Sequence, residues 1–241
     1  MRILALDTAT SATAVALLDA ETGQAVALRD DPPAGERPRH TTRLMELVVE
    51  ALERAQIGWG AVDRIAVGVG PGTFTGLRIG VATARALATT RRIPLVGVST
   101  LRSLADAASH ERGGEEAVLA VLDARRREVF AAAWDADTSL LEVGAMAPVE
   151  LAAWLRATER RWLAVGDGAV AWRSALASDA VRIPADGLDC HGVSALAHCR
   201  IAAAIAPGPV QAVVPDYVRR PDAELALDAL QAVVAPKVSA R

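Results

Sequence analysis

The stretch IAVGVGPGTFTGLRIG, residues 65–80, joins a strand, a glycine-rich turn and the start of a helix. The β-branched residues of 64–69 are typical of a buried strand, and Gly70-Pro71-Gly72 ends it before a helix predicted over 74–90. Glycines at such a junction permit tight turning, and the free amides at a helix start can bind an anion. Because the spacing matches neither G-x-G-x-x-G nor a Walker A motif, a phosphate site and a purely structural turn stay equally open here.

Outward from this stretch, the sequence of the first half predicts three strands before it and one after it. A helix is expected after the third, fourth and fifth strands. The strands are expected at 2–7, 12–19, 24–29 and 94–98, the further helices at 41–56 and 100–110, and a turn at 21–23. The resulting order is strand, strand, strand, helix, strand, helix, strand, helix. This order is typical of ribonuclease-H-like folds and predicts a mixed sheet with helices packed on it.

The second half of the chain repeats this order. Its strands are expected at 117–123, 128–134, 140–143 and 162–165, and its helices at 148–157, from Gly168 to about 177, and at 192–205. Two similar halves indicate a duplicated α/β fold with two lobes and a cleft between them. We expect an N-terminal lobe over 1–110, a C-terminal lobe over 115–220, and a short tail over 221–241, with Gly113-Gly114 as the joint.

The composition excludes several classes of protein. With 241 residues, of which 52% are hydrophobic, the chain is long and apolar enough to bury a core. No run of eighteen uncharged apolar residues predicts a membrane span, and Asp7 interrupts the apolar start, which favours a strand over a signal peptide. A net charge of −3 opposes a protein that grips nucleic acid alone. Two cysteines are too few for a disulfide framework, so we expect a cytoplasmic protein.

In each half of the chain, the first strand ends in an aspartate, Asp7 in the first half and Asp123 in the second. Asp7 could orient a nucleotide or a metal-bound water, but a carboxylate that caps its own turn is favoured. The matching hairpin of sugar-kinase, Hsp70 and actin-type ATPases carries glycines that wrap phosphate, and neither half has them here. The arginine run after Asp123 could hold phosphate, although a solvated turn is favoured. The candidates for a vestigial nucleotide cleft are Asp7, Gly70, Gly72, Thr73, Asp123, Gly166 and Gly168.

The histidines and cysteines do not predict a metal site. His40 has no second histidine four residues on, so it forms no helical metal pair. If a helix begins near Gly192, His191 and His198 lie about two turns, roughly 10 Å, apart, which is too far to share one zinc ion. Ser99 does not lie in a G-x-S-x-G elbow and is a natural N-cap for the helix after it. We therefore expect no metal, no cofactor and no catalytic residue.

Two helices have features that predict a partner surface. The helix over 41–56 has a second apolar line beside its core stripe, and the helix over 74–90 has small residues at four-residue spacing, which let another helix approach closely. The alternative, helices buried on both sides, is equally open. Arginine at position 80 or aspartate at position 49 is expected to disrupt pairing without unfolding the lobes. The candidate partner-binding residues are Met45, Val49, Leu52, Gly76, Gly80 and Ala84.

On these residues the chain resembles the bacterial TsaB family, also called YeaZ. Residues 65–80 are the specific match, and supporting matches lie at 3–10, 40–47, 97–101, 123–125, 166–168 and 215–219. The resemblance implies an actin-like, Hsp70-like duplicated fold. It also implies a part in making N6-threonylcarbamoyladenosine at position 37 of tRNAs that read codons beginning with A.

The resemblance further implies which proteins act with this chain. A TsaD-type paralogue transfers the carbamoyl group, a TsaE-type ATPase docks on the pair, and the two helices described above form the TsaD contact or, without TsaD, a homodimer. The H-x-x-x-H metal pair of TsaD-type proteins and both sets of hairpin glycines are missing, which implies a catalytically silent scaffold that meets tRNA only through the complex. The alternatives are a weak nucleotide-binding enzyme or a peptidase acting alone, and a free-standing tRNA-binding module, which the acidic balance opposes.

Overall fold

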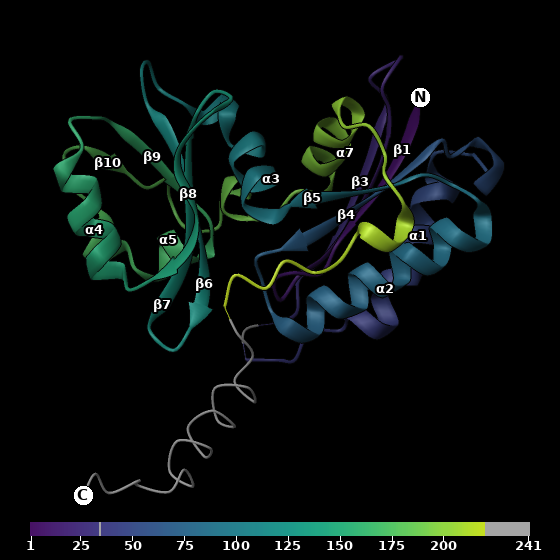
Figure 1. Ribbon diagram of the computed structural model, residues 1–241, viewed down its shortest axis with the longest axis horizontal. Coiled ribbons are helices and arrows are strands. Elements are labelled where there is room, and N and C mark those ends of the chain that lie inside the picture. Colours follow the sequence, from purple (N-terminus) through teal and green to yellow (C-terminus); the bar gives the residue numbers. More distant parts are fainter. Residues whose placement is uncertain (34, 220–241) are drawn as a thin grey trace, which may run out of the picture.

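Two five-stranded sheets, one from each half of the chain, form the frame of the molecule (Figure 1). The structure is a computed structural model that describes residues 1–33 and 35–219, so the tail expected over 221–241 lies outside the described residues. The first sheet has the order β3-β2-β1-β4-β5. Its strands are β1 (Arg2–Asp7), β2 (Thr13–Asp19), β3 (Ala25–Asp30), β4 (Arg64–Gly70) and β5 (Leu95–Ser99).

The second sheet repeats the first in strand order and direction. It runs β8-β7-β6-β9-β10, and in both sheets the first strand pairs antiparallel with the second and parallel with the fourth. Its strands are β6 (Ala117–Arg125), β7 (Glu128–Asp135), β8 (Thr138–Met146), β9 (Trp162–Val165) and β10 (Val181–Arg182). The duplicated, two-lobed ribonuclease-H-like fold predicted from the sequence is confirmed.

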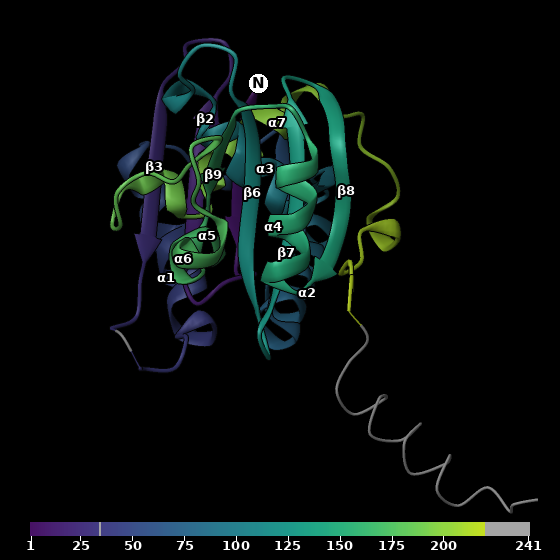
Figure 2. The same cartoon turned by 90° about the vertical axis from the view of Figure 1, so that its left-hand side faces the viewer.

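Helices form three layers around the two sheets, as Figures 1 and 2 show. α1 (His40–Arg54) and α2 (Phe74–Arg91) cover the outer face of the first sheet, and α4 (Pro148–Ala157), α5 (Asp167–Ala171) and α6 (Arg173–Leu176) cover the outer face of the second. The middle layer consists of α3 (Thr100–Ala107), which packs on β6 and β7, and α7 (Ala195–Ala204), which packs on β1 and β2. Single 3₁₀ turns lie at Trp59–Ala61, Ser109–Glu111, Asp189–His191 and Val210–Ala212.

Local sequence explains most of these boundaries. The Ser99 side chain accepts a hydrogen bond from the Arg102 amide at 3.3 Å and so caps α3 as predicted. Pro148 occupies the first turn of α4, where its missing amide costs nothing. On α1, Leu44, Leu47 and Val48 lie on the face that packs against the first sheet. Truncating one buried leucine of this kind to alanine typically costs about 2–5 kcal/mol, so this stripe anchors the helix.

Three predictions from the sequence need correction. The helix expected from Gly168 to about 177 is interrupted at Trp172, which leaves α5 and α6 as two short helices. The strand expected at 140–143 extends over the whole of β8, and β10 was not expected. The last helix begins at Ala195 rather than 192 and packs on the first sheet, although the expected division placed it in the lobe over 115–220. No helix among the described residues is long and apolar enough to cross a membrane.

Candidate functional site

The glycine-rich turn between β4 and α2 packs directly on the loop between β1 and β2. The Thr73 amide donates a hydrogen bond to the Ala9 carbonyl oxygen at 2.7 Å. A Cβ atom on Gly72 would lie 2.4 Å from that same oxygen, and a Cβ atom on Gly76 would lie 1.9 Å from the Thr8 carbonyl oxygen. Backbone therefore fills the space that a bound phosphate would need beside these two glycines. Of the two alternatives left open by the sequence, the contacts favour the structural turn.

Asp7, at the end of β1, lies in a sealed polar cluster. Its Oδ1 atom accepts a hydrogen bond from the Ala9 amide at 2.7 Å, which is the turn-capping role favoured from the sequence. Its Oδ2 atom accepts from Thr100 Oγ1 at 3.1 Å and lies 3.0 Å from His198 Nε2, outside hydrogen-bond geometry. Because Asp7 is only 1% exposed and His198 is fully buried, solvent and ligands do not reach the carboxylate.

The cluster continues from His198 to a serine. Ser103 Oγ lies 2.6 Å from His198 Nδ1 and donates a hydrogen bond to the Ser194 carbonyl oxygen at 2.9 Å. The Ser103 hydroxyl, the His198 imidazole and the Asp7 carboxylate lie in the order of the catalytic triad of a serine hydrolase. In such an enzyme, however, the serine nucleophile must be able to contact the substrate. Ser103 is fully buried, so the three groups hold β1, α3 and α7 together instead. His198 was considered from the sequence only as a zinc ligand, and its contacts with Asp7 and Ser103 were not predicted.

The second-lobe candidates form a separate group around the end of β6. Asp123 accepts a hydrogen bond from the Arg125 amide at 2.9 Å and pairs with the Arg125 guanidinium at 3.2 Å. A Cβ atom on Gly166 would lie 2.0 Å from the Val121 carbonyl oxygen, and one on Gly168 would lie 2.9 Å from the Asp123 amide. The structure thus gathers Asp123, Gly166 and Gly168 in one lobe, while the contacts of Asp7, Gly72 and Thr73 lie around β1 in the other.

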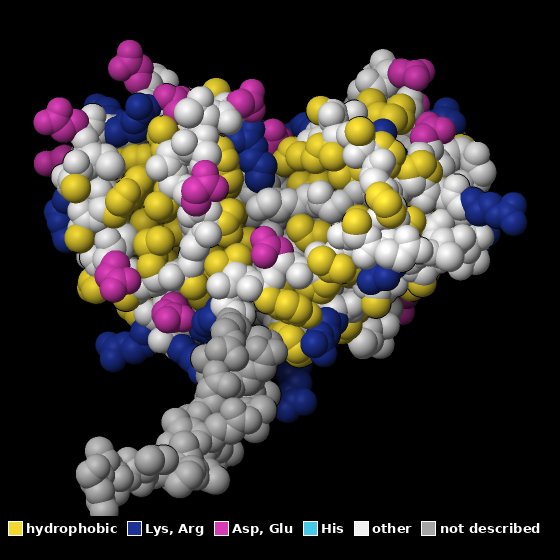
Figure 3. Space-filling view, in the orientation of Figure 1, with side chains coloured by type: hydrophobic (Ala, Val, Ile, Leu, Met, Phe, Trp, Pro, Cys, Tyr) yellow, Lys and Arg dark blue, Asp and Glu magenta, His cyan; other side chains and the backbone are white. Residues whose placement is uncertain are grey.

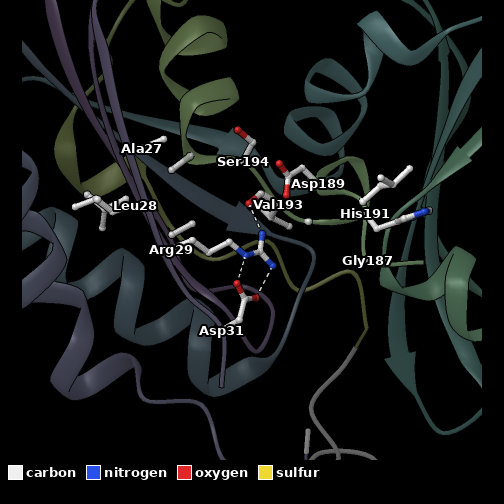
Figure 4. A pocket seen from close by; sticks show the side chains of 14 residues that line it. Ala27, Leu28, Arg29, Asp31, Gly187, Asp189, His191, Val193 and Ser194 are labelled. Carbon is white, nitrogen blue, oxygen red and sulfur yellow. Dashed lines mark hydrogen bonds and ion pairs between the residues drawn. The ribbon is translucent and has the colours of Figure 1, made fainter. Parts of the chain in front are cut away.

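A cavity of about 570 Å³ lies between the lobes (Figure 4). Its walls come from β2, β3 and residues 187–195, and none of the seven nucleotide-cleft candidates lines it. Arg29 reaches across it, with its guanidinium held by Asp31 at 2.6 and 2.8 Å and by the Val193 carbonyl oxygen at 3.0 Å. The Arg29 guanidinium therefore already has hydrogen-bond partners within the chain. Among the described residues, no group of three or more histidine, cysteine, aspartate or glutamate side chains could hold a metal ion.

The predicted partner surface is smaller than expected. On α1, Met45 and Val49 are 40% and 45% exposed, whereas Leu52 is buried in the core under the helix. The small residues of α2 face inward, because Gly76, Gly80 and Ala84 are all buried. A Cβ atom on Gly80 would lie 2.4 Å from Thr8 Oγ1, so Gly80→Arg cannot separate docking from folding. The stripe of small residues brings α2 close to β1 and leaves Met45 and Val49 as the exposed pair.

An exposed aromatic pair at the start of α2 was not predicted. The Phe74 and Tyr217 ring centroids lie 5.2 Å apart, and the Arg78 guanidinium lies 3.7 Å from the Phe74 centroid and donates from Nε to Tyr217 Oη at 2.9 Å. Tyr217 reaches α2 because the segment after α7 returns along the first lobe, where the Asp216 amide donates to the Val69 carbonyl oxygen. The four-residue spacing of Phe74 and Arg78 was the available signal.

His40 begins α1 and makes the start of this helix sensitive to acid. Burial lowers the pKa of His40 from its usual 6.5, against the opposing effects of the Thr10 backbone and of the Asp7 and Asp30 carboxylates. The His40 Nδ1 atom lies 2.9 Å from Thr13 Oγ1. Because the folded-state pKa is lower than the unfolded one, the unfolded chain binds more protons in mild acid. The stabilising effect of a neutral His40 is therefore present above pH 6.5 and lost as the pH falls below it.

We expect the free energy of unfolding to fall between pH 7.5 and pH 5.5, by at most about 1.4 kcal/mol from this group, and to fall less in His40→Asn. Urea titrations of both proteins at the two pH values measure this difference. Equal losses in the two proteins would assign the acid sensitivity to another group.

Comparisons with a family model, with curated proteins and with solved structures all find proteins of the TsaB, YeaZ or TsaD type. A family model described as "TsaD: tRNA N6-adenosine threonylcarbamoyltransferase" matches residues 33–153. The chain is 34% identical over 180 residues to the tRNA threonylcarbamoyladenosine biosynthesis protein TsaB of Escherichia coli K12, over 71% of this chain and 74% of that protein. It is also 34% identical to the TsaB protein of Bacillus subtilis, over 64% and 65%. A solved structure of YeaZ from Pseudomonas aeruginosa covers 90% of this chain at 30% identity, with a TM-score of 0.73.

Proposed function

The chain belongs to the TsaB (YeaZ) family of tRNA threonylcarbamoyladenosine biosynthesis proteins, and we propose on this basis that it is a non-catalytic subunit of the modifying complex. In this role it holds a TsaD-type paralogue on which a TsaE-type ATPase docks. The TsaD-type subunit transfers the threonylcarbamoyl group to N6 of adenosine 37 in tRNAs that read codons beginning with A. The complex works in the cytoplasm, and the chain meets tRNA only as part of it.

The sealed Asp7 cluster is the observation that carries a non-catalytic role. General acids, bases and nucleophiles must come within hydrogen-bond reach of the reacting atoms. Asp7, Ser103 and His198 are buried and already surrounded by groups of the chain. The same burial opposes a peptidase or a nucleotide-dependent enzyme that would act through these residues.

The face of α1 that carries Met45 and Val49 is the proposed contact with the TsaD-type paralogue. The TsaD family model matches residues 33–153, which contain α1 and α2. A paralogue that shares these two helices presents an equivalent face, so the pair can form around a pseudo-two-fold axis. The same arrangement of two copies of this chain gives the homodimer proposed in the absence of the paralogue.

Reconstitution tests the proposed role. The TsaD-type and TsaE-type proteins, threonylcarbamoyl-adenylate synthase, threonine, bicarbonate, ATP and unmodified tRNA are incubated with and without this chain, and modified adenosine is measured by mass spectrometry. We expect product only when the chain is present, and neither ATP hydrolysis nor peptide cleavage by the chain alone. Equal product without the chain would contradict the proposal, and turnover by the chain alone would support the enzyme alternative.

A further inference from the structure

The turn between β6 and β7 has a backbone that does not suit its residues. Arg125, Arg126 and Arg127 have φ angles of +63°, +53° and +64°. This left-handed region is unfavourable for residues with a Cβ atom, and tight hairpin turns that need it usually contain Asn-Gly. The chain places arginine at three successive positions where asparagine or glycine would stabilise the turn. Strained positions of this kind are concentrated at functional sites, where the side chain is needed.

The three arginines are exposed at a protruding end of the second lobe. All three are exposed to solvent, with the Arg125 side chain 73% exposed. Figure 1 shows the β6–β7 turn at the lower tip of the lobe, and in Figure 3 arginine side chains gather along this lower edge. The two acidic residues that flank the turn have arginine partners, since Asp123 pairs with Arg125 and Glu128 with Arg219 at 2.9 Å. Asp167 also lies beside Asp123, whose amide donates a hydrogen bond to Asp167 Oδ1 at 3.0 Å.

The three arginines of the turn indicate a phosphate-bearing partner. This is the only run of three basic residues in a chain with a net charge of −3. A guanidinium group binds a phosphate through two parallel hydrogen bonds, and a nucleic-acid backbone offers phosphates at regular spacing. The turn itself has no aromatic residue for stacking on a base, so its contacts would position a nucleic acid without reading its sequence.

We propose that the β6–β7 turn, residues 125–127, contacts the phosphate backbone of the RNA substrate in the modifying complex. The proposal rests on the proposed function, because it deepens the statement that tRNA is met through the complex. An acidic chain with one basic turn binds RNA poorly alone. Once a partner holds the RNA, the same turn acts at a high effective concentration and adds affinity.

The test uses Arg126→Asn combined with Arg127→Gly. These residues suit the left-handed backbone, so the variant is expected to unfold at a temperature a few degrees higher than the wild type. Binding of unmodified tRNA transcript to the complete complex is measured by fluorescence anisotropy at several salt concentrations. We expect the Kd to rise about 3- to 10-fold and the slope of log K against log salt to become shallower by roughly 1 to 2.

Two further variants separate charge from conformation. Arg126→Lys with Arg127→Lys retains the charges and the unfavourable backbone, and is expected to retain the salt slope of the wild type. Arg92→Gly removes an exposed arginine from another left-handed position, φ +54°, at the far end of α2, and is expected to leave the tRNA Kd unchanged.

The proposal would be overturned if the Arg126→Asn, Arg127→Gly variant bound tRNA as tightly as the wild type does. It would also be overturned if this variant lost affinity for the TsaD-type subunit while the complex kept its affinity for tRNA. If wild-type complex and complex lacking this chain modify tRNA equally, the proposed function fails instead, and the two failures are therefore distinguishable.

Discussion

Val49→Asp is expected to weaken pairing with the TsaD-type paralogue by at least about 30-fold and to abolish tRNA modification at limiting protein concentration. Val49 is 45% exposed on α1 beside Met45, so the substitution leaves the core intact and the free energy of unfolding should change by less than about 0.5 kcal/mol. In the complex, however, the carboxylate would be desolvated without a partner, which typically costs about 2–5 kcal/mol. Isothermal titration calorimetry with the purified paralogue measures the affinity.

Val149→Asp is the matched control for this experiment. Val149 is also an exposed valine on a helix, but it lies on α4 in the second lobe. It should neither weaken pairing nor reduce modification. A Val49→Asp protein that pairs normally would place the contact elsewhere on the molecule, and the exposed pair Phe74 and Tyr217 would be the next face to alter.

Asp7→Ala is expected to lower the free energy of unfolding by about 3–5 kcal/mol. Removing the acceptor of a buried polar cluster leaves its buried donors unsatisfied, which typically costs about 1–3 kcal/mol for each donor. Here the Ala9 amide and Thr100 Oγ1 would lose their acceptor, and the buried His198 ring would lose its neighbour. Urea unfolding followed by circular dichroism measures the loss.

Asp31→Ala provides the comparison, because its carboxylate pairs with Arg29 at the surface, where ion pairs contribute at most about 1 kcal/mol. An Asp7→Ala protein that is as stable as the wild type would contradict the structural role of the cluster. If such a stable protein also failed to support tRNA modification, a chemical role for Asp7 would have to be reconsidered.

The order of strands and the duplication could be read from the sequence because both depend on local patterns. Alternating or continuous apolar runs define the strands, and the breaks at Gly70-Pro71-Gly72 and Gly166-Asp167-Gly168 separate them from helices. Asp7 was also interpreted correctly as a turn cap, since its partner, the Ala9 amide, is two residues away. Local chemistry sufficed wherever the contacts were local.

The candidate site was harder to predict because its contacts are distant in the sequence. His198 meets Asp7 from a helix near the other end of the chain, and no spacing rule connects them. Likewise, the four-residue spacing of small residues on a helix does not show whether they face the core of the same chain or a partner. Gly76 and Gly80 could have served a partner helix or a segment of the same lobe, and only the position of Thr8, directly after β1, shows that they serve the same lobe. Leu52 belongs to the core for the same reason, since neighbouring elements determine which helical face is buried.

The position of α7 has a consequence for how the protein is made. Ala195, Cys199 and Ala202 of this helix cover one face of the first sheet, including Ile3 and Ala5. The last strand of that sheet ends at Ser99 and α7 begins at Ala195, so a ribosome releases all five strands well before it releases their cover. The lobe that is synthesised first is therefore completed last, and its inner face has to be kept from aggregation until nearly the whole chain has emerged.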